Sequence, residues 1–145
     1  MKTSIITLLL AVVPLAGLAE APKVSMGNGE ANWIITEGAT RDGSTFTFPE
    51  VHIAGNGWLV MHPFKDGKPD GKTVSGYSYL AAGASSWVEI TVDTAPASGD
   101  HYIVMLHSDV NENSAFDFVF VNEREVLDKA VFEGSTMIGH VFESP

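Results

Sequence analysis

The chain has 145 residues, a length that allows one domain and leaves no room for a second at roughly 100 to 200 residues per domain. Its 8 Lys and Arg residues against 18 Asp and Glu residues give a net charge of -10 at pH 7, so we expect no nucleic-acid partner, because such binding depends on phosphate neutralisation. Cysteine is absent, which excludes disulfides, thiol nucleophiles, zinc–thiolate sites and iron–sulfur clusters.

Residues 1–19 have the pattern of a cleavable signal peptide. Lys2 supplies a positive charge, an apolar run from Ile5 to Val13 follows, and small residues lead to a cleavage point after Ala19. The apolar run is shorter than the roughly 20 residues needed to span a bilayer. We therefore expect an exported, soluble protein, periplasmic or extracellular, with no stable membrane insertion after cleavage.

Residues 20–31 are expected to form a flexible arm, and residues 32–145 a single domain. In this domain, short runs rich in β-branched and aromatic residues alternate with turn residues, which is typical of strands. The predicted strands are Trp33–Thr36, Thr45–Ile53, Trp58–His62, Thr73–Leu80, Trp87–Val92, His101–His107, Phe116–Val121, Ala130–Phe132 and Met137–Phe142.

Three segments add detail to this pattern. Tyr102–Leu106 and Phe118–Val121 are apolar on both sides, which predicts central strands covered on both faces. Pro49 lies inside a predicted strand and indicates an edge strand or a bulge, because proline cannot donate to a central ladder. Asn122–Lys129 fits either a hairpin turn or a short helix. The fold class predicted is all-β: an antiparallel β-sandwich of Greek-key or immunoglobulin-like topology with about eight strands.

The most specific polar pattern lies in residues 109–117. Oxygen-bearing side chains recur at alternate positions there, as in loops that bind Ca²⁺ through about six to eight oxygen ligands. The alternative is a polar turn whose side chains bond their own backbone and need no ion. The candidate calcium ligands are Asp109, Asn111, Asn113 and Asp117.

Histidine and methionine offer a second metal site. Thioether and imidazole donors select copper, and the candidate copper ligands are His62, Met105 and His107. Met105 and His107 share a face of an extended strand, whereas Met61 and His62 point to opposite faces. The alternative is that the methionines pack in the core and the histidines lie at strand ends near water.

No catalytic motif stands out, so we expect a protein that is not an enzyme. The sequence contains no G-x-S-x-G nucleophile turn, no H-E-x-x-H zinc motif and no glycine-rich phosphate loop. Four aromatic residues could instead form a sugar-binding platform or pack as ordinary strand residues. These are Trp58, Trp87, Tyr77 and Tyr79.

Several segments together resemble a known but uncharacterised family. A G-W-x-x-x-H strand at Gly57–His62 is followed by an M-L-H-x-D-x-N-x-N strand and loop at Met105–Asn113. With Val74–Leu80 and Val88–Asp93, these segments are similar to exported bacterial and archaeal β-sandwich domains of unknown function. The resemblance covers roughly 45–142 and implies a fold and an extracytoplasmic setting. The family's recurring polar positions fall on His62, His107, Asp109, Asn111, Asn113 and Asp117.

The function predicted first is binding or adhesion at the cell envelope, to a protein or glycan partner, by a domain with a calcium loop at residues 109–117. The alternative is a periplasmic copper-binding protein that uses His62, Met105 and His107. A hydrolase with an unrecognised site is the third class.

Overall fold

The structure is a computed structural model that describes residues 17, 23–118, 120–121 and 125–145. Apart from Gly17, the expected signal peptide lies outside the described residues. In the part of the chain that is described, no helix is long and apolar enough to cross a membrane.

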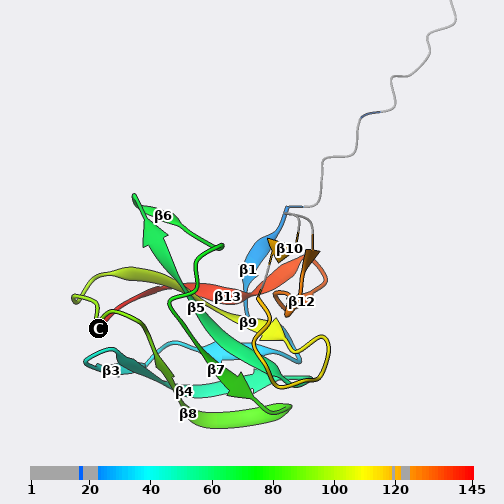
Figure 1. The fold of residues 1–145 in the computed structure, drawn as a ribbon, viewed down its shortest axis with the longest axis horizontal. Helices are drawn as coiled ribbons and strands as arrows, with labels where there is room; N and C mark the ends of the chain where they lie inside the picture. The colour runs from blue at the N-terminus through cyan, green and yellow to red at the C-terminus, as the bar shows by residue number, and fades with distance from the viewer. Residues whose placement is uncertain (1–16, 18–22, 119, 122–124) are drawn as a thin grey trace, which may run out of the picture.

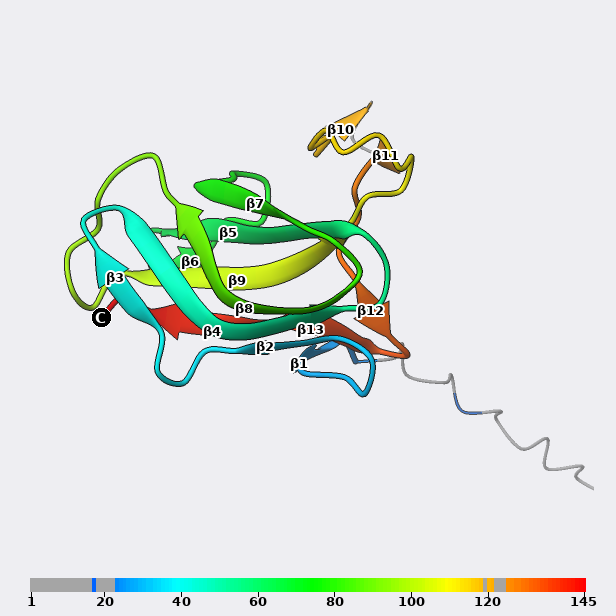
Figure 2. The ribbon, with the colours of Figure 1, turned by 90° about the horizontal axis from the view of Figure 1, so that it is seen from below.

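Two β-sheets pack face to face, so the predicted β-sandwich is confirmed (Figures 1 and 2). The larger sheet follows the order β1-β13-β9-β5-β6, with β12 beside β13 and β7 beside β5. One pair, β1 with β13, is parallel. The strands of this sheet are β1 (Ser25–Gly27), β5 (Gly57–Lys65), β6 (Lys68–Pro69), β7 (Gly76–Leu80), β9 (His101–Ser108), β12 (Phe132–Glu133) and β13 (Thr136–Glu143).

The smaller sheet has β4 at its centre, with β2 and β3 on one side and β8 on the other. A separate two-stranded ladder lies apart from both sheets in Figure 2. The strands of the smaller sheet are β2 (Trp33–Ile35), β3 (Thr40–Asp42), β4 (Thr45–Ile53) and β8 (Gly83–Thr91), and the ladder consists of β10 (Phe120–Val121) and β11 (Glu125–Val126).

The main core lies between the two sheets. Alternate residues of β4, such as Phe46 and Phe48, are fully buried there, as the period of two along a strand predicts. The larger sheet contributes Leu59 and Met61 from β5 and Val104 from β9. The residues that alternate with these core residues along β5 and β9, such as Val60 and Met105, point to the outer face of the larger sheet.

Pro49 lies in a central strand and not at an edge. The ladder between β4 and β8 pairs Phe48 with Val88 and Glu50 with Ser86, and it omits Pro49 and the residue opposite. That opposite residue, Trp87, has a positive φ of 54°. The missing proline N–H is thus accommodated by a local break in the ladder with no change of register, so neither an edge strand nor an added bulge residue is needed.

The segment from Phe116 to Val121 differs from the prediction, which was a strand that is central from Phe118 onward. Residues 116–118 are irregular, and among the described residues of this segment Phe120 and Val121 form a strand, in the ladder apart from the sheets. The apolar character of Phe116 and Phe118 has another cause, since both rings pack against the outer face of the larger sheet. Of 122–129, the described part contains β11 and no helix.

β1 lies within residues 20–31, for which the sequence predicts a flexible arm. It pairs with β13, and the carboxylate of Glu133 accepts hydrogen bonds from the backbone N–H groups of Glu30 and Ala31. The same carboxylate accepts from the Asn32 side chain, and these hydrogen bonds lower the pKa of Glu133, that from Asn32 most. Residues 25–31 thus have a fixed place against the sheet.

Candidate functional site

The outer face of the larger sheet carries a second apolar cluster. Trp58 and Val60 of β5 pack there with Ile103 and Met105 of β9, separately from the core between the sheets. The partly buried rings and side chains against this cluster include Phe116, from the loop after β9. The loop therefore covers a sheet face that would otherwise expose large hydrophobic side chains.

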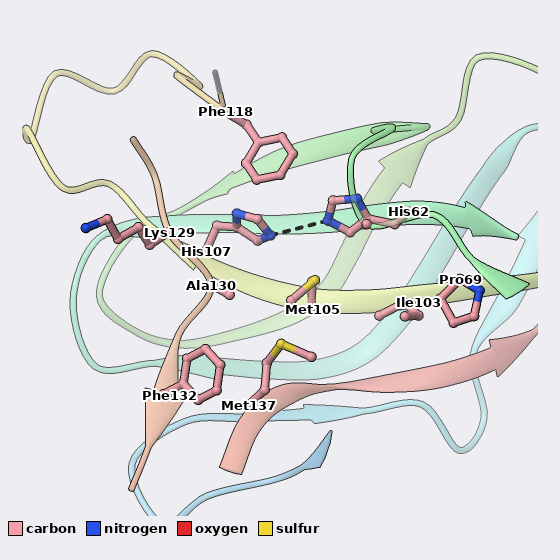
Figure 3. A pocket seen from close by; sticks show the side chains of 11 residues that line it. His62, Pro69, Ile103, Met105, His107, Phe118, Lys129, Ala130, Phe132 and Met137 are labelled. Atoms are coloured by element: carbon pink, nitrogen blue, oxygen red, sulfur yellow. Dashed lines mark hydrogen bonds between the residues drawn. The ribbon is translucent and has the colours of Figure 1, made fainter. Parts of the chain in front are cut away.

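A pocket of about 510 Å³ opens between this face and its cover (Figure 3). Its wall is mostly apolar, its polar groups are two imidazoles and one ammonium, and no Asp or Glu is among the described residues that line it. The lining residues are His62, Pro69, Gly71, Ile103, Met105, His107, Phe118, Lys129, Ala130, Phe132 and Met137.

The register of β5 and β9 places the two histidines around Met105. All three residues point to the outer face because they alternate with core residues along their strands. Residues of β5 and β9 that face each other across the ladder form rows. The row that contains His62 lies four residues, or roughly 13 Å, along the strands from the row that contains His107. Met105 lies in the row midway between them. The rows are Trp58 with His107, Val60 with Met105, and His62 with Ile103.

The two imidazole rings lean toward each other across this gap. Their Nε2 atoms are 3.3 Å apart. The Nδ1 atom of His62 is 2.7 Å from the carbonyl oxygen of Thr73, and the Nδ1 atom of His107 is 2.6 Å from the carbonyl oxygen of Asp128. A carbonyl oxygen only accepts, so each Nδ1 carries the proton that it donates. In the neutral rings both Nε2 atoms then carry lone pairs, and these lone pairs face each other.

Burial favours the neutral rings. Loss of solvent lowers the pKa of His107 to about 4, although its hydrogen bond to the Asp128 carbonyl opposes the shift. Burial also lowers the pKa of His62, against the opposing influence of the Thr73 carbonyl and of Asp70. A proton shared between the two Nε2 atoms would create an imidazolium in this desolvated place. Two converging lone pairs without a proton between them are a ready site for a cation.

Aromatic rings close the other side of the histidine pair. The ring centroid of Phe118 lies 5.5 Å from that of His62 and 5.0 Å from that of His107, in edge-to-face geometry. Phe116 stacks nearly parallel to Phe118 and contacts Tyr77 and Trp58. In Figure 3 the Phe118 ring lies on one side of the pair, and Met105 and Met137 lie on the other.

The candidate copper ligands from the sequence, His62, Met105 and His107, are thus brought to one pocket. Met61 points into the core on the opposite face, as alternation along the strand predicts. Sequence reasoning missed Met137 and Phe118, which also line the pocket. A methionine on a third strand and a phenylalanine in a loop have no spacing relation to the histidines that could have indicated either residue.

The calcium candidates form a hydrogen-bonded loop. The carboxylate of Asp109 accepts from the backbone N–H groups of Asn113 and Ser114, at 3.2 and 2.9 Å. One carboxylate oxygen of Asp117 accepts from the side-chain amides of Asn111 and Asn113, which lower the pKa of Asp117. These contacts are those of self-bonded Asx turns, which hold without an ion. In the described residues no three His, Asp or Glu side chains are grouped so as to hold a metal, and calcium at this loop stays a prediction.

The aromatic residues considered for a sugar platform differ in how far their side chains are exposed to solvent. Trp58 is buried and contacts Tyr77 and Tyr79 edge-to-face, so its ring faces are not open to solvent. Trp87 is exposed. A glycan partner stays a prediction.

Asp128 joins the covering loop to the histidine pair. Its side chain is fully buried, and its carboxylate accepts from the backbone N–H groups of Val110 (3.2 Å) and Asp117 (2.7 Å). Its own carbonyl receives the Nδ1–H of His107. One residue therefore holds both ends of residues 110–117, immediately before Phe118, and also orients one imidazole.

Replacement of Asp128 by Ala is expected to lower the free energy of unfolding by about 1 to 3 kcal/mol, because two N–H groups lose a buried acceptor. Urea denaturation measures the change. The matched control is Asp100→Ala. The carboxylate of Asp100 accepts a hydrogen bond from the Ala97 N–H in an exposed turn, and its removal should lower the free energy of unfolding by well under ~1 kcal/mol. Equal effects of the two substitutions would contradict the role of Asp128.

A family model described as "Domain of unknown function (DUF7282)" matches residues 33–139. This match covers most of the chain and confirms the resemblance to an uncharacterised family that the strand and loop motifs indicate. Comparison with curated proteins found no match, and comparison with solved structures found none.

Proposed function

We propose that this chain, which belongs to the family of domains of unknown function that covers residues 33–139, binds copper between His62 and His107. The observation that carries the proposal is the pair of Nε2 atoms, 3.3 Å apart, in rings whose Nδ1 atoms each lie beside a backbone carbonyl oxygen. Histidines that ligate metals commonly donate their other ring N–H to a backbone carbonyl, which is the arrangement of both rings here.

Copper suits the donors better than calcium or magnesium. Those two ions prefer oxygen ligands, whereas the polar donors that face this pocket are imidazole nitrogens and thioether sulfurs. Met105 lies in the strand row between the two histidines, where its sulfur can complete the set. The role we propose is a carrier or buffer of copper, and not an enzyme; the described residues that line the pocket include no Ser, Thr, Asp or Glu.

The setting we propose is the periplasm or the exterior of the cell. It is supported by the apolar leader in the sequence, with its single Lys2 and its small residues before Ala19. The net charge of -10 argues for partners other than nucleic acid.

Copper retention by purified variants tests the proposal. We expect the wild-type protein to retain one copper ion per chain after passage over a desalting column, and His62→Gln and His107→Gln to lose affinity by about 100-fold or more, since each removes one of two nitrogen ligands. The matched control is His101→Gln, because His101 is half exposed and lies outside the pocket. Retention by His62→Gln and His107→Gln as strong as in the wild type would overturn the proposal.

Thermal unfolding separates the copper and calcium predictions. Copper should raise the melting temperature of the wild type and not that of His107→Gln, since a ligand that binds only the folded state stabilises it by about 2.7 kcal/mol at 100 times its dissociation constant. Stabilisation by millimolar calcium, unaffected by His107→Gln and abolished by Asp109→Asn, would instead support the loop at residues 109–117.

A further inference from the structure

The separation of the two Nε2 atoms fits a bent pair of ligands better than a collinear one. Two nitrogens each about 2.0 Å from one ion lie about 4 Å apart if the ligands are collinear, and about 3.3 Å apart at a tetrahedral angle. The observed separation is 3.3 Å. A bent pair leaves one side of the ion open to further donors.

Two thioether side chains, those of Met105 and Met137, line the same pocket as the two histidines. Met105 projects from β9 between the histidine rows, and Met137 lines the same pocket from the neighbouring strand β13 (Figure 3). The residue of β13 opposite Met105 is Gly139, where a Cβ would lie 2.8 Å from the Met105 Cβ. Only glycine leaves the Met105 side chain its space at this crossing.

The charge of the pocket selects the oxidation state. Two neutral imidazoles and two thioethers bring no negative charge, no Asp or Glu is among the described lining residues, and Lys129 adds a positive charge to the lining. The free energy needed to desolvate an ion rises with the square of its charge. Desolvation of a divalent ion in this pocket therefore costs about four times as much as that of a monovalent one. Soft thioether donors also favour Cu(I).

We propose that the site takes Cu(I) in preference to Cu(II) and Zn(II), with Met137 as a fourth ligand beside His62, His107 and Met105. This inference rests on the proposed function and adds to it the oxidation state and one ligand that the sequence did not indicate.

Competition with a chromophoric Cu(I) chelator, without oxygen, tests the inference on the full chain. Met137→Leu should weaken Cu(I) binding by about tenfold or more and remove one sulfur from the copper X-ray absorption spectrum. Met→Leu nearly conserves volume, so the fold should persist. The matched control is Met61→Leu, a neighbour of His62 in sequence whose sulfur lies in the core on the far face of the sheet, and its Cu(I) affinity should equal that of the wild type.

The outcomes distinguish the two proposals. Failure of the wild type to hold copper in either oxidation state overturns the proposed function and this inference together. Copper bound by the wild type with unchanged affinity and sulfur scattering in Met137→Leu overturns the role of Met137 alone. Binding of Cu(II) or Zn(II) as tight as that of Cu(I) overturns the selectivity.

Discussion

The metal-free protein is expected to lose about 3 kcal/mol of folding stability through His107 as the pH falls from 6.5 to 4. Burial holds the pKa of His107 at about 4 in the folded protein, against 6.5 in an exposed histidine. Between these values the unfolded chain takes up a proton that the folded chain does not, so acid favours unfolding. The contribution is complete above pH 6.5 and absent below about pH 4, where the ring is protonated in both states.

Urea denaturation at a series of pH values, with a chelator present, measures this loss. His62 adds to it in the same direction, since burial lowers its pKa also. The control is His107→Leu, which removes the titrating ring and should flatten the dependence between pH 4 and 6.5 relative to the wild type. If the stability curves of the two proteins run parallel across that window, His107 is not held neutral by its surroundings.

Phe46→Ala is expected to lower the free energy of unfolding by about 3 to 5 kcal/mol, the range for a large aromatic ring removed from a packed core. Phe46 is fully buried on β4 of the smaller sheet. Its ring centroid lies 5.6 Å from that of Tyr102 on β9 and 5.6 Å from that of Phe142 on β13, so it contacts the larger sheet across the sandwich. The loss of this ring leaves a cavity between the sheets, and β9 and β13 cannot close it without moving.

Equilibrium denaturation compares Phe46→Ala with the control Val141→Ala. Val141 is on β13 but 57% exposed, and its truncation should change stability by no more than about 0.5 kcal/mol. Similar changes in the two variants would mean that the sheets do not pack through Phe46. The comparison tests the sandwich directly, independently of any metal.

The bounds of β4 were predicted best, and those of β9 to within one residue, whereas β8 begins four residues before the predicted Trp87–Val92. Thr45–Ile53 has the bounds of β4, because its β-branched and aromatic residues occur at alternate positions and turn residues flank it. Phe116–Phe118 misled the prediction, because an apolar loop that covers a sheet face and an apolar central strand have the same composition. The side to which such residues pack depends on the sheet that they meet, which lies elsewhere in the sequence.

The candidate site was predicted in part. Alternation along one strand is local, and it established that Met105 and His107 share a face while Met61 and His62 do not. The donors from other strands and loops, Met137 and Phe118, were out of reach of such reasoning. Each is brought to the pocket by pairing or packing that residue spacing does not encode.

The sequence by itself determined the all-β class and the two-residue period that turns His62, Met105 and His107 out of the core. Only the tertiary structure decided that the two histidines, 45 residues apart, meet at their Nε2 atoms. The period of two leaves strand registers that differ by two residues equally compatible with the face pattern, so the pairing of β5 with β9 is not readable from it. The direction of the lone pairs depends on the carbonyl oxygens of Thr73 and Asp128, whose positions follow from turns that only the packed molecule holds in place.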